Sequence, residues 1–368
     1  MSTTQLSIYA VGDMRFNRPN PESLFELALP TLKKADILFG QLECSMSDRG
    51  VAQRASFHVR PNVSPKSVSG LTFAGFDIIS YASNTTLGTG EDAMLDTIDV
   101  LRNNNITVIG VGKNIKEARK PAIIERKGTK VGLLAYCSVV PKGFEAGEDR
   151  SGVAPMRAST YYEQVDWQPG TPPNIITTAD KDDLAAMVDD IKKVRPLVDI
   201  LIMSIHWGIH MVPAVIAMYQ KEVAYAAIDA GVDLILGHHA HILKGIEVYK
   251  GKVIFYSLGN FVLPSFKDAS LMTMRLYGRE GRDDHEYPDY QYPVDLRKSM
   301  VAKCLISNKK IEKVSYLPVM INPHAQPGIL PRSDKRSSEV FDYIEWCCRD
   351  QGLDTRFSWE GDEVVVLT

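Results

Sequence analysis

Three histidines stand within four residues of one another in the segment LILGHHAH, residues 234–241. They are His238, His239 and His241, and the whole chain holds 8 histidines. The segment begins as an apolar run of the kind that forms a buried strand. A parallel sheet presents the residues that follow its strands to a crevice at its edge. Imidazoles gathered at such a position indicate a metal site or a catalytic site.

Four other apolar runs also end in a side chain that could bind a metal. Each of these residues alone has an ordinary alternative as a turn residue, a helix cap or a satisfied core histidine. Because the carboxyl ends of parallel strands share one edge, we expect all of them to converge with His239 and His241. Carboxylate, amide and imidazole ligands suit Mn, Fe, Zn or Ni better than a cysteine-based structural zinc. The four residues are Asp13, Glu43, Asn84 and His206.

The elements that would position these residues alternate along the chain. Residues 91–105 predict an amphipathic helix, since Met94, Ile98 and Leu101 share one face. Short apolar runs alternate with helical patterns, which predicts an α/β fold with a parallel sheet. Strands are expected at residues 7–11, 36–39, 76–81, 106–111, 131–137, 199–205, 233–236 and 252–256, and further helices at 182–194 and 213–230.

Two segments break this alternation. Residues 141–180 are rich in Gly, Pro, Tyr and Thr, and a segment this long is expected to be an irregular lid or insertion. After about residue 270 the pattern fades, so we divide the chain into a catalytic domain, 1–270, and a C-terminal extension, 271–368, that packs on it. The extension is expected to hold a hairpin over residues 300–319 that turns at Asn308-Lys309, a helix over 337–349 and an edge strand over 364–367.

Composition excludes several classes of protein. The net charge is -3, and no block of Lys or Arg supports binding to nucleic acid or to an anionic membrane. The N-terminal residues lack a basic region before a long apolar stretch, so we expect no signal peptide and no membrane span. The 5 cysteines show no framework spacing, which favours reduced thiols and a cytoplasmic location.

The motifs together resemble the CapA family of bacterial capsule and poly-γ-glutamate synthesis proteins, within the calcineurin-like metallophosphoesterase superfamily. The resemblance covers about residues 5–265. It implies a four-layer α/β/β/α sandwich with a dinuclear metal site between the sheets. The motifs that carry it are Gly12-Asp13, Gly40-Gln41-Leu42-Glu43, Ala82-Ser83-Asn84, His206-Trp207-Gly208, Gly237-His238-His239-Ala240-His241 and Tyr256-Ser257-Leu258-Gly259-Asn260-Phe261.

The resemblance also implies a ligand for each metal. Asp13 and His241 would hold one of two divalent transition metals (Mn, Fe or Zn), and Glu43 would bridge to the other. Two such metals can share a bridging hydroxide that attacks the substrate. His238 could exchange roles with His239. The ligands implied for the second metal are Asn84, His206 and His239, and Ser257 and Asn260 are expected nearby as supporting or substrate contacts.

Three positions depart from the family pattern. Thr85 stands where the family has a histidine, and a threonine hydroxyl is a poor general acid at neutral pH. Gln41 stands where Asn is common, and His210 where Glu is common. We therefore expect a retained metal site with altered chemistry, in which His210 or His58 supplies the proton or the leaving group of the substrate needs none.

The substrate is expected to be a small and anionic molecule. Arg15, Arg18 and Arg60 are candidates for binding its carboxylate or phosphate, and a solvated surface position is the alternative for each. The first hypothesis is a metal-dependent hydrolase that cleaves an amide or acyl bond or a phosphoester. The second is a non-catalytic metal-binding partner in capsule or poly-γ-glutamate biosynthesis. The region after 270 is the expected source of a lid or of a contact between copies of the chain in a homo-oligomer.

Overall fold

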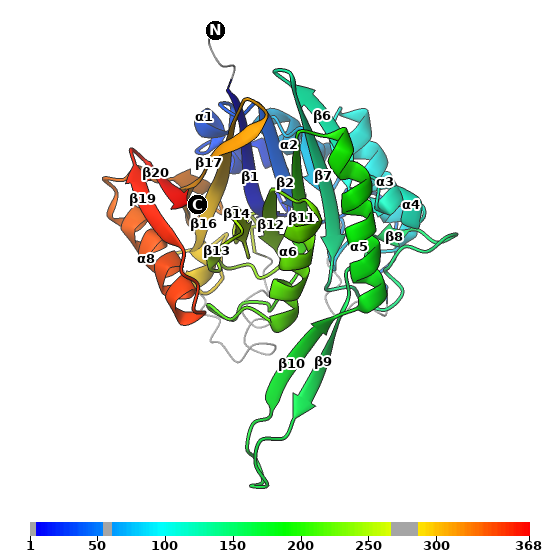
Figure 1. The fold of residues 1–368 in the computed structure, drawn as a ribbon. Helices are drawn as coiled ribbons and strands as arrows, with labels where there is room; N and C mark the ends of the chain where they lie inside the picture. Colours follow the sequence, from blue (N-terminus) through cyan, green and yellow to red (C-terminus); the bar gives the residue numbers. More distant parts are fainter. Residues whose placement is uncertain (1–4, 54–60, 266–285) are drawn as a thin grey trace.

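Two sheets pack face to face, and helices cover their outer faces (Figure 1). The computed structural model describes residues 5–53, 61–265 and 286–368. The central strands are buried along almost their whole length, as expected for strands that are covered on both faces. The predicted α/β class and its four-layer sandwich are confirmed.

The larger sheet joins the two ends of the chain. Its parallel part consists of β1 (Leu6–Met14), β2 (Ile37–Leu42), β3 (Ile78–Ser80) and β4 (Thr107–Ile109). The strand β15 (Asn260–Val262) pairs with the end of β1, where Asp13 lies beside Asn260. On the side of β1 opposite β2, the same side as β15, follow the C-terminal strands β16 (Lys298–Ser307), β17 (Lys310–Ile321), β20 (Glu363–Leu367) and β19 (Arg356–Glu360), while β18 (Pro327–Ile329) also pairs with β17.

The smaller sheet has a parallel centre and antiparallel borders. The strands β7, β11, β12 and β14 run parallel, so their carboxyl ends point the same way. The border strands β6 and β13 pair antiparallel with β7 and β14. In spatial order the sheet is β13 (Ile246–Tyr249), β14 (Lys252–Phe255), β12 (Leu234–His238), β11 (Ile200–His206), β7 (Thr129–Cys137) and β6 (Ala122–Arg126).

The longer helices bury the faces that their sequence periodicity predicts. In α3 (Glu91–Asn103) the residues Met94, Ile98 and Leu101 are buried. The helix predicted from residue 213 is α6 (Met218–Ala230) and begins five residues later than expected. The backbone just before it takes positive φ angles at residues 211 and 214, which an α-helix cannot accommodate. The other helices are α1 (Leu29–Leu32), α2 (Val68–Ala74), α4 (Ile115–Ala118), α5 (Lys181–Val194) and α8 (Lys335–Asp350).

The segment 141–180 is not irregular throughout, so that part of the prediction was wrong. It contains β8 (Gly152–Val153), which pairs with β5 (Val111–Gly112). It also forms a two-stranded hairpin from β9 (Ala158–Glu163) and β10 (Asn174–Ala179), which projects from the sandwich (Figure 1). Tyr, Thr and Ile in these strands favour extended backbone.

The C-terminal region contributes strands to the larger sheet, and β16 bonds directly to β1. The predicted hairpin is confirmed, with Asn308 and Lys309 in the left-handed conformation at its turn. The predicted helix is α8. The expectation of an edge strand over residues 364–367 was wrong, because β20 lies between β17 and β19. The boundary proposed at residue 270 falls outside the described residues.

All five cysteines are buried and none forms a disulfide. Among the described residues, no helix is long and apolar enough to cross a membrane.

Candidate metal centre

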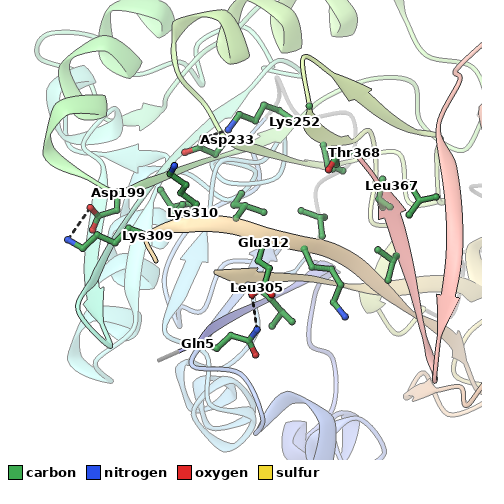
Figure 2. A pocket seen from close by; sticks show the side chains of 18 of the residues that line it. Gln5, Asp199, Asp233, Lys252, Leu305, Lys309, Lys310, Glu312, Leu367 and Thr368 are labelled. Carbon is green, nitrogen blue, oxygen red and sulfur yellow. Dashed lines mark hydrogen bonds and ion pairs between the residues drawn. The ribbon is translucent and has the colours of Figure 1, made fainter. Parts of the chain in front are cut away.

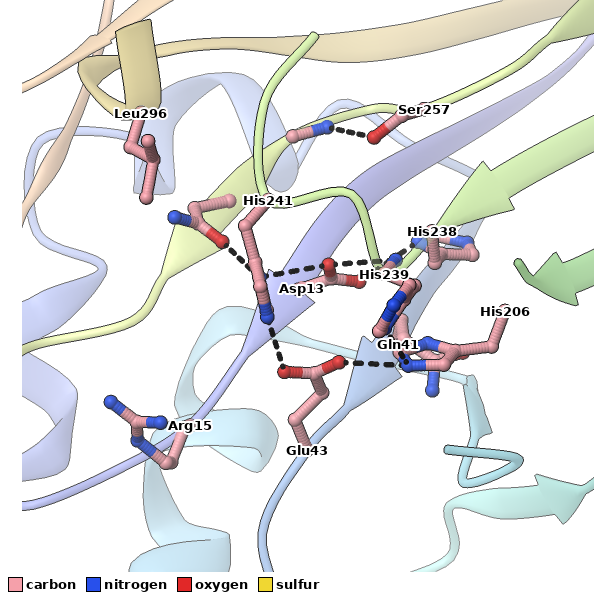
Figure 3. Close-up of polar contacts among 12 residues, drawn as sticks. Asp13, Arg15, Gln41, Glu43, His206, His238, His239, His241, Ser257 and Leu296 are labelled. Carbon is pink, nitrogen blue, oxygen red and sulfur yellow. Dashed lines mark hydrogen bonds and ion pairs between the residues drawn. The ribbon is translucent and has the colours of Figure 1, made fainter. Parts of the chain in front are cut away.

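The six candidate ligands from five strands lie at one edge of the sandwich, between the two sheets. Figure 3 labels all of them except Asn84. The larger sheet supplies Asp13 within β1, Glu43 directly after β2, and Asn84 in the turn after β3. The smaller sheet supplies His206 as the last residue of β11 and the histidines that follow β12. Parallel strands in both sheets therefore bring together residues that are far apart in the sequence.

One group of donor atoms surrounds the Nε2 atom of His206. The distance from this nitrogen is 2.9 Å to Oδ1 of Asn84, 3.1 Å to Nδ1 of His239 and 3.2 Å to Oε1 of Glu43. Such a set of one amide oxygen, one carboxylate oxygen and two imidazole nitrogens could hold a divalent transition metal.

A second group lies on the other side of Glu43. The Nδ1 atom of His241 is 3.2 Å from Oδ2 of Asp13, and its Nε2 atom is 3.4 Å from Oε2 of Glu43. The two oxygens of Glu43 thus face different groups, one toward His206 and one toward His241 (Figure 3). Within each group of carboxylates and histidines, the potential ligand atoms lie within 4.8 Å of one another.

Burial shows that these residues fit a bound metal. Asp13 and Glu43 are at most 3% exposed. Carboxylates buried this deeply are costly unless cations or hydrogen-bond donors face them. The donors are oxygens and nitrogens with no cysteine, which is typical of Mn, Fe or Zn sites that bind substrates.

The protonation states of Asp13 and His206 also suit metal ligands. Burial acts to raise the pKa of Asp13, but hydrogen bonds and charges from His238 and His241 outweigh it and hold the pKa well below its usual range. Burial, helped by the neighbouring His239, lowers the pKa of His206. For His241, burial is outweighed by Glu43 and Asp13, which raise its pKa. An ionised Asp13 and a neutral His206 are the forms that bind a metal.

The backbone decides which histidine of the cluster joins the centre. His239 has φ of 85° and His241 has φ of 58°, in the left-handed region that is uncommon for residues other than glycine. The amide of His239 donates to Oδ2 of Asp13 at 3.0 Å. His238 instead lies behind Asp13, with its Nδ1 3.3 Å from Oδ1, and packs near the ring of Phe39. Of the two alternatives, His239 is therefore the one placed beside His206.

Asn260 supports His241 from behind. Its Oδ1 lies 2.7 Å from Nδ1 of His241, and its Nδ2 donates to the hydroxyl of Tyr290 at 2.8 Å. Asn260 is fully buried, and its amide group holds the imidazole of His241 in this structure. Tyr290 was not singled out from the sequence, since no local motif marks it. Ser257 accepts the amide of Gly259 at 3.2 Å and shapes the turn there.

His210, one of the residues predicted to supply a proton to the leaving group, lies beside the candidate metal ligands. Its ring stacks on His239 with centroids 5.0 Å apart, and its centroid is 4.7 Å from that of His241. His210 is partly exposed, unlike the buried His206. The Thr85 hydroxyl lies 3.0 Å from that of Ser83. The residue at position 58 lies outside the described residues.

The predicted substrate-binding arginines have different surroundings. Arg15 is buried and donates from Nη2 to the carbonyl of Pro264 at 2.9 Å and to the hydroxyl of Tyr292 at 3.0 Å. Arg15 therefore connects the end of β1 to the segments that contain Pro264 and Tyr292. Arg18 pairs with Asp289 at 3.5 Å but also lines two cavities of about 700 and 520 Å³ beyond the end of β1. Arg60 lies outside the described residues.

A cavity of about 930 Å³ lies where β11, β12 and β14 begin, and none of the candidate ligands lines it (Figure 2). Several of its charges are already paired. Lys252 bonds to Asp233 at 2.7 Å, and Lys309 pairs with Asp199 at 3.3 Å. The latter contact joins the hairpin of the larger sheet to the start of β11. We therefore interpret these charges as structural.

Comparison with known proteins gives the family. The model of a family described as "Bacterial capsule synthesis protein PGA_cap" matches residues 7–265. The chain belongs to this family. Its relatives include the PGA biosynthesis protein CapA of Bacillus subtilis (strain 168), which is 29% identical over 273 residues, and the capsule biosynthesis protein CapA of Bacillus anthracis, which is 26% identical over 286 residues.

These matches cover 70% and 74% of this chain but only 63% and 64% of the two relatives. Among solved structures, the chain is similar to a hypothetical protein from Thermus thermophilus, with a TM-score of 0.47 and 11% identity over 85% of this chain and 98% of the other. It is also similar to a putative 5'-nucleotidase from Staphylococcus aureus in complex with alpha-ketoglutarate, with a TM-score of 0.45 and 13% identity over 93% of this chain and 58% of the other.

Proposed function

We propose that this member of the PGA_cap family is a metal-dependent hydrolase with a dinuclear centre. The observation that carries the proposal is the position of Glu43, whose two carboxylate oxygens face two separate groups of ligands. A carboxylate placed in this way suits a bridge between two metals. Asp13 and His241 would hold one metal, and the ligands of the other would be Asn84, His206 and His239.

The chemistry proposed is attack by water on an amide or acyl carbonyl or on a phosphoester of a small molecule. Two divalent ions, such as Mn²⁺, Fe²⁺ or Zn²⁺, would lower the pKa of water and neutralise charge on the oxygens of the group under attack. A strong general base from the protein is then unnecessary to activate the water, which fits a centre whose side chains are all candidate metal ligands.

The protein's own residues would orient the reaction. His210 is partly exposed beside His239 and His241, so we assign it to face the substrate and to supply the proton of the leaving group. Asn260 keeps the imidazole of His241 in place. The cavities beside Arg18 are the proposed location for an anionic part of the substrate.

A second function is supported by the names of the relatives. Two of them are described as biosynthesis proteins for PGA or capsule, and a relative from Mycobacterium tuberculosis, 31% identical over 202 residues, is a probable polyglutamine synthesis accessory protein. This chain could accordingly bind metal as a non-catalytic partner in making capsule or poly-γ-glutamate. The cost of burying so many polar ligands argues for a metal under either function.

Metal content and turnover distinguish the two functions. Protein reconstituted with Mn²⁺ should bind the metal and hydrolyse either p-nitrophenyl phosphate or a γ-glutamyl p-nitroanilide. The Glu43→Gln variant should lose metal and turnover, whereas Glu26→Gln, at an exposed position, should behave as the wild type. Turnover of the phosphate without the anilide would reject amide hydrolysis. Metal binding without turnover on any substrate of either class would favour the non-catalytic partner.

A further inference from the structure

The loop that carries His210 is held in place by a buried lysine. Lys244 is only 2% exposed, and its ammonium donates to the carbonyl of Val215 at 2.7 Å and to that of Val212. Burying an ammonium group is costly, and here backbone oxygens of a single loop satisfy it. Lys244 lies three residues after His241 in the sequence, so one short segment carries both a candidate ligand and this cation.

The loop needs such support because its backbone is strained. Met211 and Ala214 both have φ of 55°, a left-handed conformation that is unfavourable for L-residues. The amide of Met211 donates to the carbonyl of Ala240 at 2.9 Å, which ties the loop to the residue between His239 and His241. This bond and the contacts of Lys244 both hold the residues that directly follow His210 in the sequence.

The end of α8 holds the other side of the loop. The side chain Oε1 of Gln351 accepts the amide of Ile216 at 3.0 Å, and the thiol of Cys347 interacts with the backbone of Ala214. These C-terminal residues lie beyond the family match, which ends at residue 265. A part of the chain outside the family motifs thus reaches the loop next to the candidate metal centre.

We propose that Lys244 is a positioning residue, supported by Gln351, that fixes the 211–216 loop so that the imidazole of His210 faces His239 and His241. The C-terminal helix is then part of the machinery that orients the centre. The effect on turnover rests on the proposed function. The effect on the orientation of His210 does not, because it can be observed in protein without substrate.

Nuclear magnetic resonance of histidine side chains tests the orientation directly. In protein labelled at histidine, Lys244→Met should shift or broaden the His210 resonances, which are assigned with His210→Ala. The exposed His324 serves as an internal reference and should not move. Lys244→Arg keeps donors for the two carbonyls and should restore the wild-type signal. Lys250→Met removes an exposed lysine and is the matched control.

Kinetics provide the second measurement. With Mn²⁺ bound to the wild-type content, Lys244→Met should lower kcat by roughly tenfold to a hundredfold and change KM less than twofold, because a misplaced group mainly affects the reacting step. In the His210→Ala background the same change should have almost no further effect.

Unchanged His210 resonances in folded Lys244→Met protein would overturn the proposal, as would an equal loss of kcat in both backgrounds. If Lys244→Met does not fold, the His210 resonances of Gln351→Ala are compared with those of the wild type instead. A smaller shift is expected in this variant. If the His210 resonances shift in Lys244→Met but the wild-type protein hydrolyses none of the substrates, the positioning role of Lys244 stands. The proposed hydrolysis is then rejected.

Discussion

At the end of β12 the backbone separates three histidines that are almost adjacent in the sequence. His238 completes the strand and lies against Asp13, while the positive φ of His239 turns its side chain toward His206. His241 reaches Glu43 from the opposite side. Neighbouring histidines therefore have different roles, and substitutions should distinguish them.

We predict that His239→Ala removes metal binding and activity, because it deletes a donor atom of the group around His206. His238→Ala should weaken metal binding only by about 10–100-fold, since His238 acts through Asp13. Metal content by mass spectrometry and a competition assay with a chromophoric chelator measure both effects. The reverse order of severity would show that His238 is the ligand.

Asn260→Ala should loosen His241 and lower the affinity for the metal on that side by about 10–100-fold. Asn260→Asp retains an acceptor for the imidazole and should recover part of the loss. The exposed Asn174→Ala provides the control. Equal metal affinity in Asn260→Ala and the wild type would contradict a supporting role for Asn260.

Among the elements, three C-terminal strands are joined by one buried charge. Glu363 in β20 accepts from Lys303 of β16 at 2.5 Å and from Lys313 of β17 at 2.6 Å. Burial acts to raise the pKa of Glu363, but the two lysines outweigh it and lower the pKa. A carboxyl whose pKa is lowered in the folded protein stabilises the fold above its unfolded pKa, and loses that contribution as the pH falls through the folded value.

We therefore predict that Glu363→Gln lowers the free energy of unfolding at pH 7 by about 1–2 kcal/mol, because the partly buried Lys303 and Lys313 lose their shared carboxylate, although Lys313 keeps Glu360. The difference between variant and wild type should shrink as the pH falls below about 4, where the wild-type carboxyl becomes protonated. Urea unfolding at several pH values measures this. A difference that is independent of pH would show that the charge of Glu363 is not responsible.

The sequence predicted well the elements whose signal is local. Apolar runs marked the central strands, and the residues that follow them marked the metal centre, because the carboxyl ends of parallel strands meet by geometry. Pairings between distant segments left no such signal. The hydrogen bond between Asn260 and Tyr290, the burial of Arg15 and the contact of Gln351 with the His210 loop all depend on tertiary packing.

For the whole molecule, the C-terminal region completes the sheet that begins with β1. The strand β16 pairs with β1 from Leu6 to Val11, and α8 packs against β17 and β13. The side chains of Met300 and Val301 are fully buried in the common core. The residues that the family model matches therefore depend on residues that follow them.

We predict that a chain ending at residue 265 does not fold, because β1 would lose its antiparallel neighbour and apolar core would be exposed. Circular dichroism and size-exclusion chromatography would show loss of native structure or aggregation. As a control, residues 164–173 can be replaced by Asn-Gly, since Glu163 and Asn174 are paired and accept a two-residue turn. This shortened hairpin should leave the fold intact. A folded, monomeric truncation would contradict the prediction.

The left-handed backbone conformations of His239 and His241 lower the stability of the fold at the two positions where the candidate metal centre needs an imidazole. Glycine would occupy either position with less backbone strain, but it would also remove the imidazole that faces His206 or the carboxylates of Asp13 and Glu43. A search for heat-resistant variants that considers backbone strain alone would choose these positions and destroy the candidate centre. The two positions must therefore be held constant while stabilising substitutions are sought elsewhere in the chain.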